Sequence, residues 1–152
     1  MRKAPYLLAL VLLSGCRAAP QQAPPPFKPV ADVKQLMQAV IDPAADVVWG
    51  AVGSIETKDG VQEIYPKNEA EWLLVRNAAI TLAEGGNLLM MDGRAKDRAE
   101  WQKHSLDLIE LGTRAIKVAE KQDRQGVFDV GAEIYATCSA CHEKYQVRIV
   151  EP

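Results

Sequence analysis

The chain contains one short stretch whose residue types and spacing could do chemistry, Cys138-Ser139-Ala140-Cys141-His142. On a helix, positions i, i+3 and i+4 share one face, so both thiols and the imidazole would project in the same direction. The two sulfurs can then bond the vinyl groups on one edge of a porphyrin, and the adjacent imidazole can bind its iron. The motif therefore predicts covalent attachment of one haem c through Cys138 and Cys141, with His142 as an axial iron ligand.

Two other kinds of site also use closely spaced cysteines. A structural zinc site needs four ligands, and the remaining candidates, Cys16 and His104, do not form a second pair at similar spacing. A redox dithiol usually opens a helix that follows a strand in a βαβ unit, whereas this motif lies in a helix-like stretch near the C-terminus. Haem attachment is the preferred interpretation, and both alternatives stay open.

The N-terminus has the pattern of an export signal. Arg2 and Lys3 precede an apolar run over 4–13, which is too short to span a bilayer. Residues 13–16 read Leu-Ser-Gly-Cys and resemble a bacterial lipobox, so we expect a lipoprotein signal peptide over 1–15 and acylation of Cys16. An ordinary cleaved leader with an incidental cysteine is the alternative. The expected location is the bacterial periplasm, with a lipid anchor in the inner or outer membrane. Export agrees with the haem motif, because c-type haems are attached on the outer side of the bacterial inner membrane.

Composition separates a tether from a folded domain. Residues 16–30 contain five prolines, which favour an extended polyproline form, so we interpret them as a tether between the bilayer and a soluble domain over 31–147. Disorder without a spacing role is the alternative, and 148–152 form a short tail. The formal net charge of −2 argues against nucleic acid as a partner, because phosphate binding needs a basic surface.

The first half of the domain predicts a helix with an interruption. Apolar residues recur at helical spacing over 33–55, but Pro43 lacks a backbone donor, so a kink or break is expected there, with Asp42 capping the second half. A connection follows over 53–68. Its Asp59-Gly60 pair predicts a turn, and we expect a hairpin-like loop rather than a sheet.

Three further helices are predicted in the second half. Asn68 and Glu71 resemble a capping pair at the start of a helix that the Gly85-Gly86 pair weakens near its end. The next helix is expected over 95–122, with a charged, water-facing start at 94–100. The last helix follows Gly126 and ends near Tyr145, and the three tryptophans are expected to be core residues first.

Together these helices predict an all-α fold, an antiparallel four-helix bundle that encloses one covalently bound haem c. The haem motif on the last helix, with Phe128-Asp129-Val130-Gly131 before it and Glu143-Lys144-Tyr145 after it, resembles cytochrome c′ and the related low-spin cytochrome c556 type. The likeness covers about 31–147. One difference is Gln146, which stands where many family members carry a basic residue.

The resemblance implies a role for the first helix in completing the iron site. In the c556 type a first-helix methionine binds the iron, which makes Met37 the candidate sixth ligand. In the c′ type an apolar residue shields an empty position instead. His104 is a weaker rival, and a buried Met37 could also be a plain core residue. Lys34, one turn before Met37, is a candidate contact for a haem propionate. The family also implies a homodimer through the first two helices.

One-electron transfer to and from redox partner proteins is the expected function, with no enzymatic turnover. No second metal site or acid–base pair accompanies the haem motif, and a His and Met axial pair favours reversible electron transfer. The alternative is a five-coordinate haem protein that binds nitric oxide or carbon monoxide. A third interpretation is a structural subunit that carries haem without turnover.

Overall fold

The computed structural model describes residues 27–146. The predicted signal peptide, the acylation site Cys16, most of the tether and the tail lie outside these residues. In chain order the elements are α1 (Val33–Leu36), the π-helical turn η1 (Met37–Ile41), α2 (Asp42–Gly50), β1 (Gly53–Thr57), β2 (Gly60–Ile64), α3 (Glu69–Leu89), α4 (Glu100–Glu120) and α5 (Arg124–Tyr145).

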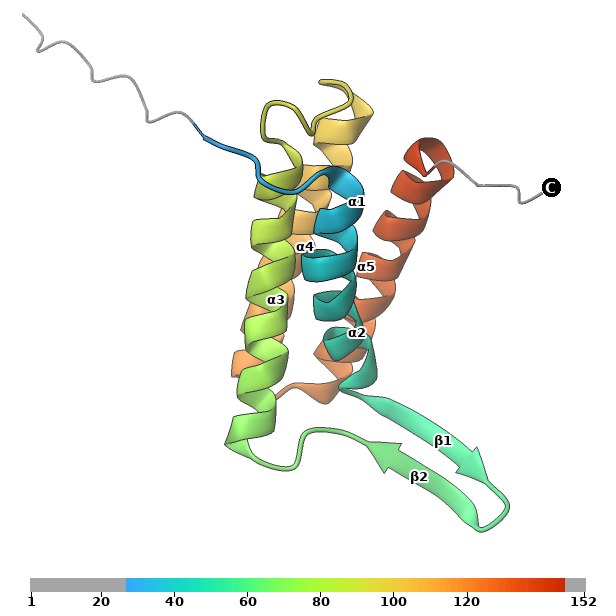
Figure 1. Cartoon of the computed structure of the whole chain (residues 1–152). Helices are drawn as coiled ribbons and strands as arrows, with labels where there is room; N and C mark the ends of the chain where they lie inside the picture. Colours follow the sequence, from blue (N-terminus) through green and yellow to red (C-terminus); the bar gives the residue numbers. More distant parts are fainter. Residues whose placement is uncertain (1–26, 147–152) are drawn as a thin grey trace, which may run out of the picture.

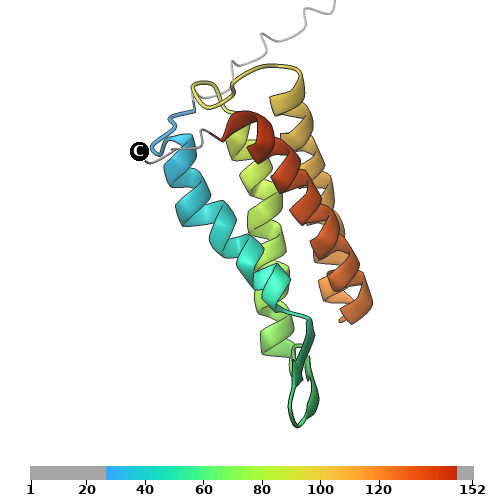
Figure 2. The same cartoon turned by 90° about the vertical axis from the view of Figure 1, so that its right-hand side faces the viewer.

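The described residues form a helical bundle with one small sheet (Figure 1). The segments α1, η1 and α2 follow one another without a break and make the first rod, and α3, α4 and α5 make the other three. Successive rods run in opposite directions and lie side by side in both views (Figures 1 and 2). The prediction of a mostly helical bundle is therefore confirmed at the level of the backbone.

The core fills the space between the rods with apolar side chains at helical spacing. Trp72 and Trp101 are buried as predicted. Trp49 is 37% exposed, so its assignment as a core residue was wrong: its indole N–H donates to the Gly131 carbonyl oxygen at 3.0 Å, at the edge of the α2–α5 contact.

Glycines allow α3 and α4 to approach closely. A Cβ on Gly86 would lie 2.5 Å from the Ser105 carbonyl oxygen, and one on Gly112 would lie 2.7 Å from the Ala83 backbone nitrogen. The Gly85-Gly86 pair is buried inside α3, which continues past it to Leu89. Here tight packing between helices outweighs the poor helix propensity of glycine.

Pro43 changes the first rod without breaking it. The Asp42 N–H donates to the Met37 carbonyl oxygen, five residues back, which gives the π-helical turn just before the proline. Asp42 keeps helical dihedral angles and caps nothing with its side chain, so the predicted cap was wrong, and of the expected kink or break the helix shows no break. The wider turn accommodates the missing donor locally. Such π-helical turns are frequent at functional sites.

The connection after α2 is a true antiparallel hairpin, so the expectation of no sheet was wrong. Ile55 pairs with Gln62, and the turn includes the predicted Asp59-Gly60 pair, with Gly60 at φ +126°, a conformation that favours glycine. Figure 1 shows the hairpin projecting beyond one end of the bundle. At its base, Arg124 forms an ion pair with Glu63 at 3.6 Å.

Two helix starts differ from the predicted ones. Helix α4 begins at Glu100 and not near Ala95, because the segment before it is a loop. Helix α5 begins at Arg124, where the Asp123 side chain accepts a hydrogen bond from the Gly126 N–H, so Gly126 lies inside the helix. The α3 cap is confirmed, since the Asn68 side chain accepts from the Glu71 N–H at 3.0 Å.

Candidate functional site

A cavity of about 940 Å³ lies between the first rod, the α3–α4 loop and the end of α5. This volume is at the upper end of the range for small-molecule and cofactor sites, about 300–1,000 Å³. Four of the residues singled out in the sequence line it together: Lys34, Met37, Cys141 and His142. Residues far apart in the chain therefore meet at one site.

Cys138 lies one helical turn before Cys141 on α5. Its side chain is partly buried and packs against the core, and it does not line the cavity wall itself. Both cysteines are free thiols. The motif is thus entirely helical, as the i, i+3, i+4 arrangement of the thiols and the imidazole requires.

The surroundings of the two thiols disfavour dithiol redox chemistry. Burial, with the nearby Cys141 and Asp42 charges, raises the pKa of Cys138 to about 11, and burial also raises the pKa of Cys141. Thiol–disulfide oxidoreductases instead lower the pKa of the attacking cysteine to obtain a thiolate. This pair lacks that activation.

Met37 is the first residue of the π-helical turn. Its side chain is partly buried, contacts the core and lines the same cavity as His142. A thioether is a soft donor of the kind that binds haem iron opposite a histidine. The structure therefore brings the predicted axial histidine and the candidate methionine to one cavity from two different rods.

Three cationic side chains line the cavity, and they differ in exposure. Lys34 and Lys96 are exposed at its edge, whereas Arg94 is only 6% exposed. The interpretation of 94–100 as a water-facing helix start was therefore wrong for Arg94. No sequence signal marks this burial, because it depends on a contact with Ala31, 63 residues away, and on a loop that folds back to the Leu88 carbonyl oxygen.

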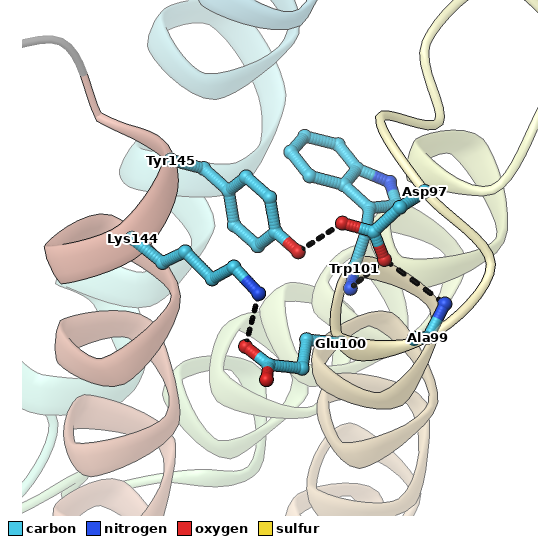
Figure 3. Close-up of polar contacts among 6 residues, drawn as sticks. All are labelled: Asp97, Ala99, Glu100, Trp101, Lys144 and Tyr145. Atoms are coloured by element: carbon cyan, nitrogen blue, oxygen red, sulfur yellow. Dashed lines mark hydrogen bonds and ion pairs between the residues drawn. The ribbon is translucent and has the colours of Figure 1, made fainter.

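A polar network fixes the end of α5 to the start of α4 (Figure 3). The Tyr145 hydroxyl donates to Asp97, and the other oxygen of that carboxylate accepts from the backbone N–H groups of Ala99 and Trp101 at 2.9 and 3.1 Å. Beside it, Lys144 forms an ion pair with Glu100 at 2.5 Å. The helical turn that follows His142 is thus held in place by contacts that the sequence did not predict.

The ring of Tyr145 also shapes the cavity. It meets the ring of Trp101 edge to face, with 5.0 Å between centroids, and both residues line the cavity. The hydrogen bond from Tyr145 lowers the pKa of Asp97, and loss of hydration followed by the bond to Asp97 raises the pKa of Tyr145. Both shifts favour the state in which the hydroxyl donates to a carboxylate.

The other candidate iron ligands lie outside the cavity. His104 is partly exposed on α4 and does not line the cavity, nor do Met90 and Met91.

A second cavity, of about 260 Å³ between α2 and α5, is lined mainly by apolar residues and by none of the predicted site residues. Within residues 27–146, no three His, Cys, Asp or Glu side chains lie close enough together to hold a metal ion.

None of the helices in the described part of the chain has the length and apolar character needed to cross a membrane. Comparison of the chain with protein-family models, with curated proteins and with solved structures gave no significant match.

Proposed function

We propose that this protein is a c-type cytochrome of the cytochrome c′ and c556 type that carries one haem c and transfers single electrons. The observation that carries the proposal is the 940 Å³ cavity that Met37, Cys141 and His142 line together. A covalent haem needs a thiol pair and an imidazole on one helical face beside such a space. The free, partly buried thiols, both with a raised pKa, fit this requirement better than they fit a dithiol enzyme.

The roles of the residues follow from their chemistry. Cys138 and Cys141 would form the two thioethers, His142 would be the axial ligand, and Met37 would be the sixth ligand. The haem supplies an iron that alternates between the ferric and ferrous states. A His and Met pair raises the reduction potential relative to a bis-histidine pair, and Trp101 and Tyr145 would exclude water on their side of the cavity.

The proposed setting is the outer side of a bacterial inner membrane or the periplasmic face of the outer membrane. Cleavage after residue 15 and acylation of Cys16 would anchor the chain in the bilayer, and the proline-rich segment would hold the bundle away from it. A tethered cytochrome of this kind would exchange electrons with redox partner proteins that also reach the periplasm.

Optical spectroscopy combined with voltammetry of the purified holoprotein tests the proposal. Electron transfer predicts a low-spin ferric spectrum with a Met–iron charge-transfer band and a reversible one-electron couple. A high-spin ferric spectrum with rapid carbon monoxide uptake after reduction would support the gas-binding alternative instead. Absence of any reversible couple would contradict electron transfer and point to a structural subunit.

A further inference from the structure

We infer that Arg94 binds a carboxylate of the group held in the cavity, which for a haem is one of its two propionates. This inference rests on the proposed function. It assigns carboxylate binding to a residue that the sequence pattern predicted to face water. Its basis is a buried cation that lines the cavity without an acidic partner among residues 27–146.

Burial makes the charge of Arg94 costly. Only 6% of the residue is exposed, and none of the ion pairs found in the described part of the chain includes it. A buried charge without a counter-ion is strongly unfavourable, so such groups are normally paired. The two acidic residues in the cavity lining, Asp32 and Asp42, form no hydrogen bond with it, and Asp32 accepts from the Gln35 N–H instead.

Hydrogen bonds from two of its three nitrogens, Nε and Nη1, hold the Arg94 guanidinium group in position. Its Nε donates to the Ala31 carbonyl oxygen at 3.0 Å, and its Nη1 donates to the Leu88 carbonyl oxygen at 3.1 Å and contacts the Met91 sulfur at 3.4 Å. A guanidinium has five N–H donors. Those on Nη2 have no hydrogen-bond partner among the described residues, so one edge of the fork is free for a ligand.

A carboxylate is the ligand that this arrangement suits. The planar fork of an arginine matches the two oxygens of a carboxylate, and the bond is charge-assisted and short. A fixed, buried guanidinium loses little side-chain entropy on binding, whereas Lys34 and Lys96 are exposed and keep their hydration. Arg94 is therefore the stronger receptor, and the two lysines are left for the second carboxylate at the cavity edge.

The expected consequence is electrostatic. With Arg94 present, the charge of the propionate is compensated, and without it an unpaired negative charge near the iron favours the ferric state. Arg94→Gln is expected to lower the midpoint potential, and Arg94→Lys, which keeps the charge, is expected to lower it less. Arg98→Gln is the matched control, because Arg98 lies in the same loop, is exposed and does not line the cavity.

The test measures midpoint potentials and redox-induced infrared difference spectra of the holoproteins. The inference predicts a lower potential and a shifted carboxylate band in Arg94→Gln, with both unchanged in Arg98→Gln. A purely structural Arg94 would reduce thermal stability but leave the carboxylate band and the potential unchanged, which would overturn the inference. Should Arg94→Gln fail to fold, Arg94→Lys supplies the same two readings.

Two further measurements distinguish a haem propionate from a free anion, and failure of this inference from failure of the proposed function. Titration of formate into wild-type holoprotein is expected to leave the potential unchanged, and a formate-dependent shift would assign the site to a free anion instead. Intact mass reports haem attachment independently. A chain without haem overturns the proposed function and this inference together, whereas haem-loaded Arg94→Gln with wild-type potential and carboxylate band overturns the inference alone.

Discussion

Met37 and His142 line the same cavity, the first from the start of the π-helical turn and the second from the last turns of α5. The two residues are far apart in the chain, and the bundle brings their rods to one space. An iron held by His142 would therefore lie in a cavity that also has a thioether in its lining. This relationship is the basis for proposing Met37 as the sixth ligand of a low-spin electron carrier.

Replacing Met37 by alanine is expected to convert the ferric haem from low spin to high spin, because the sixth ligand is lost. The measurement is the optical spectrum of the purified variant, with carbon monoxide uptake after reduction expected to become rapid. Met90→Ala is the control, since Met90 does not line the cavity. A low-spin spectrum that survives in Met37→Ala would contradict the assignment and direct attention to His104.

Replacing both Cys138 and Cys141 by alanine is expected to abolish covalent haem while leaving the bundle helical. Haem attachment is read from the denatured protein, in which only covalent haem stays with the chain. Far-ultraviolet circular dichroism checks that the helices persist. Haem that remained bound to the denatured double variant would show that the attachment residues lie elsewhere.

Replacing Cys16 by serine is expected to release the protein from the membrane without changing its haem content. The protein is produced in cells that process lipoproteins, and the fraction of it that enters the detergent phase of an extract measures anchoring. Absorbance measures the haem content. Wild-type protein should enter the detergent phase and Cys16→Ser the aqueous phase. Equal partitioning of the two proteins would show that the chain is not anchored through Cys16.

Replacing Tyr145 by phenylalanine is expected to lower the free energy of unfolding in a way that depends on pH. The folded pKa of Asp97 lies below its usual 3.8, so its stabilisation is present above that value and is lost as the pH falls through the lower folded pKa. The folded pKa of Tyr145 lies above its usual 10.0, so its stabilisation is present below that value and is lost as the pH rises through the higher folded pKa.

Denaturant unfolding across pH therefore has a specific expected shape. The difference between wild type and Tyr145→Phe should be largest between the two usual pKa values and should shrink at both extremes. Tyr135→Phe is the matched control on the same helix, because Tyr135 is 63% exposed. A difference that did not vary with pH would show that the hydroxyl acts by some contact other than its bond to Asp97.

Replacing Gly112 by alanine is expected to destabilise the bundle by about 1–3 kcal/mol, because the added Cβ would meet the Ala83 backbone. Gly86→Ala should behave alike, since its Cβ would meet the Ser105 carbonyl oxygen. Gly50→Ala is the control, with nothing within 4 Å of its Cβ, and it should be neutral or stabilise by up to about 1 kcal/mol. Thermal or denaturant unfolding measures all three, and equal effects at the three sites would contradict the packing account.

The helices could be predicted from local patterns, whereas the meeting of Met37 and His142 at one site was only implied by the family resemblance. Helical periodicity and the Asn68 cap depend on residues close together in the chain. The π-helical turn could not be predicted, because the same missing donor at Pro43 is compatible with a break, a kink or a wider turn. The turn and a hairpin-like loop were expected, but the pairing of two strands was not, since both strands are exposed and carry no alternating apolar pattern.

The polar residues of the site were the hardest to predict. Arg94 stands in a charged run that is typical of a solvated surface, and only the folded chain brings its guanidinium to the carbonyl groups of Ala31 and Leu88. Asp97 and Tyr145 are likewise far apart in sequence and meet only when α5 packs against the start of α4. Contacts of this kind depend on tertiary packing and leave no local signature.

The most direct test of the central claim is the intact mass of the mature protein, made in a host that attaches c-type haems. We expect the polypeptide mass plus one haem and the lipid on Cys16, together with the absorbance of a c-type cytochrome that survives denaturation. A colourless protein at the mass of the bare polypeptide, or of the polypeptide plus lipid alone, would contradict the claim.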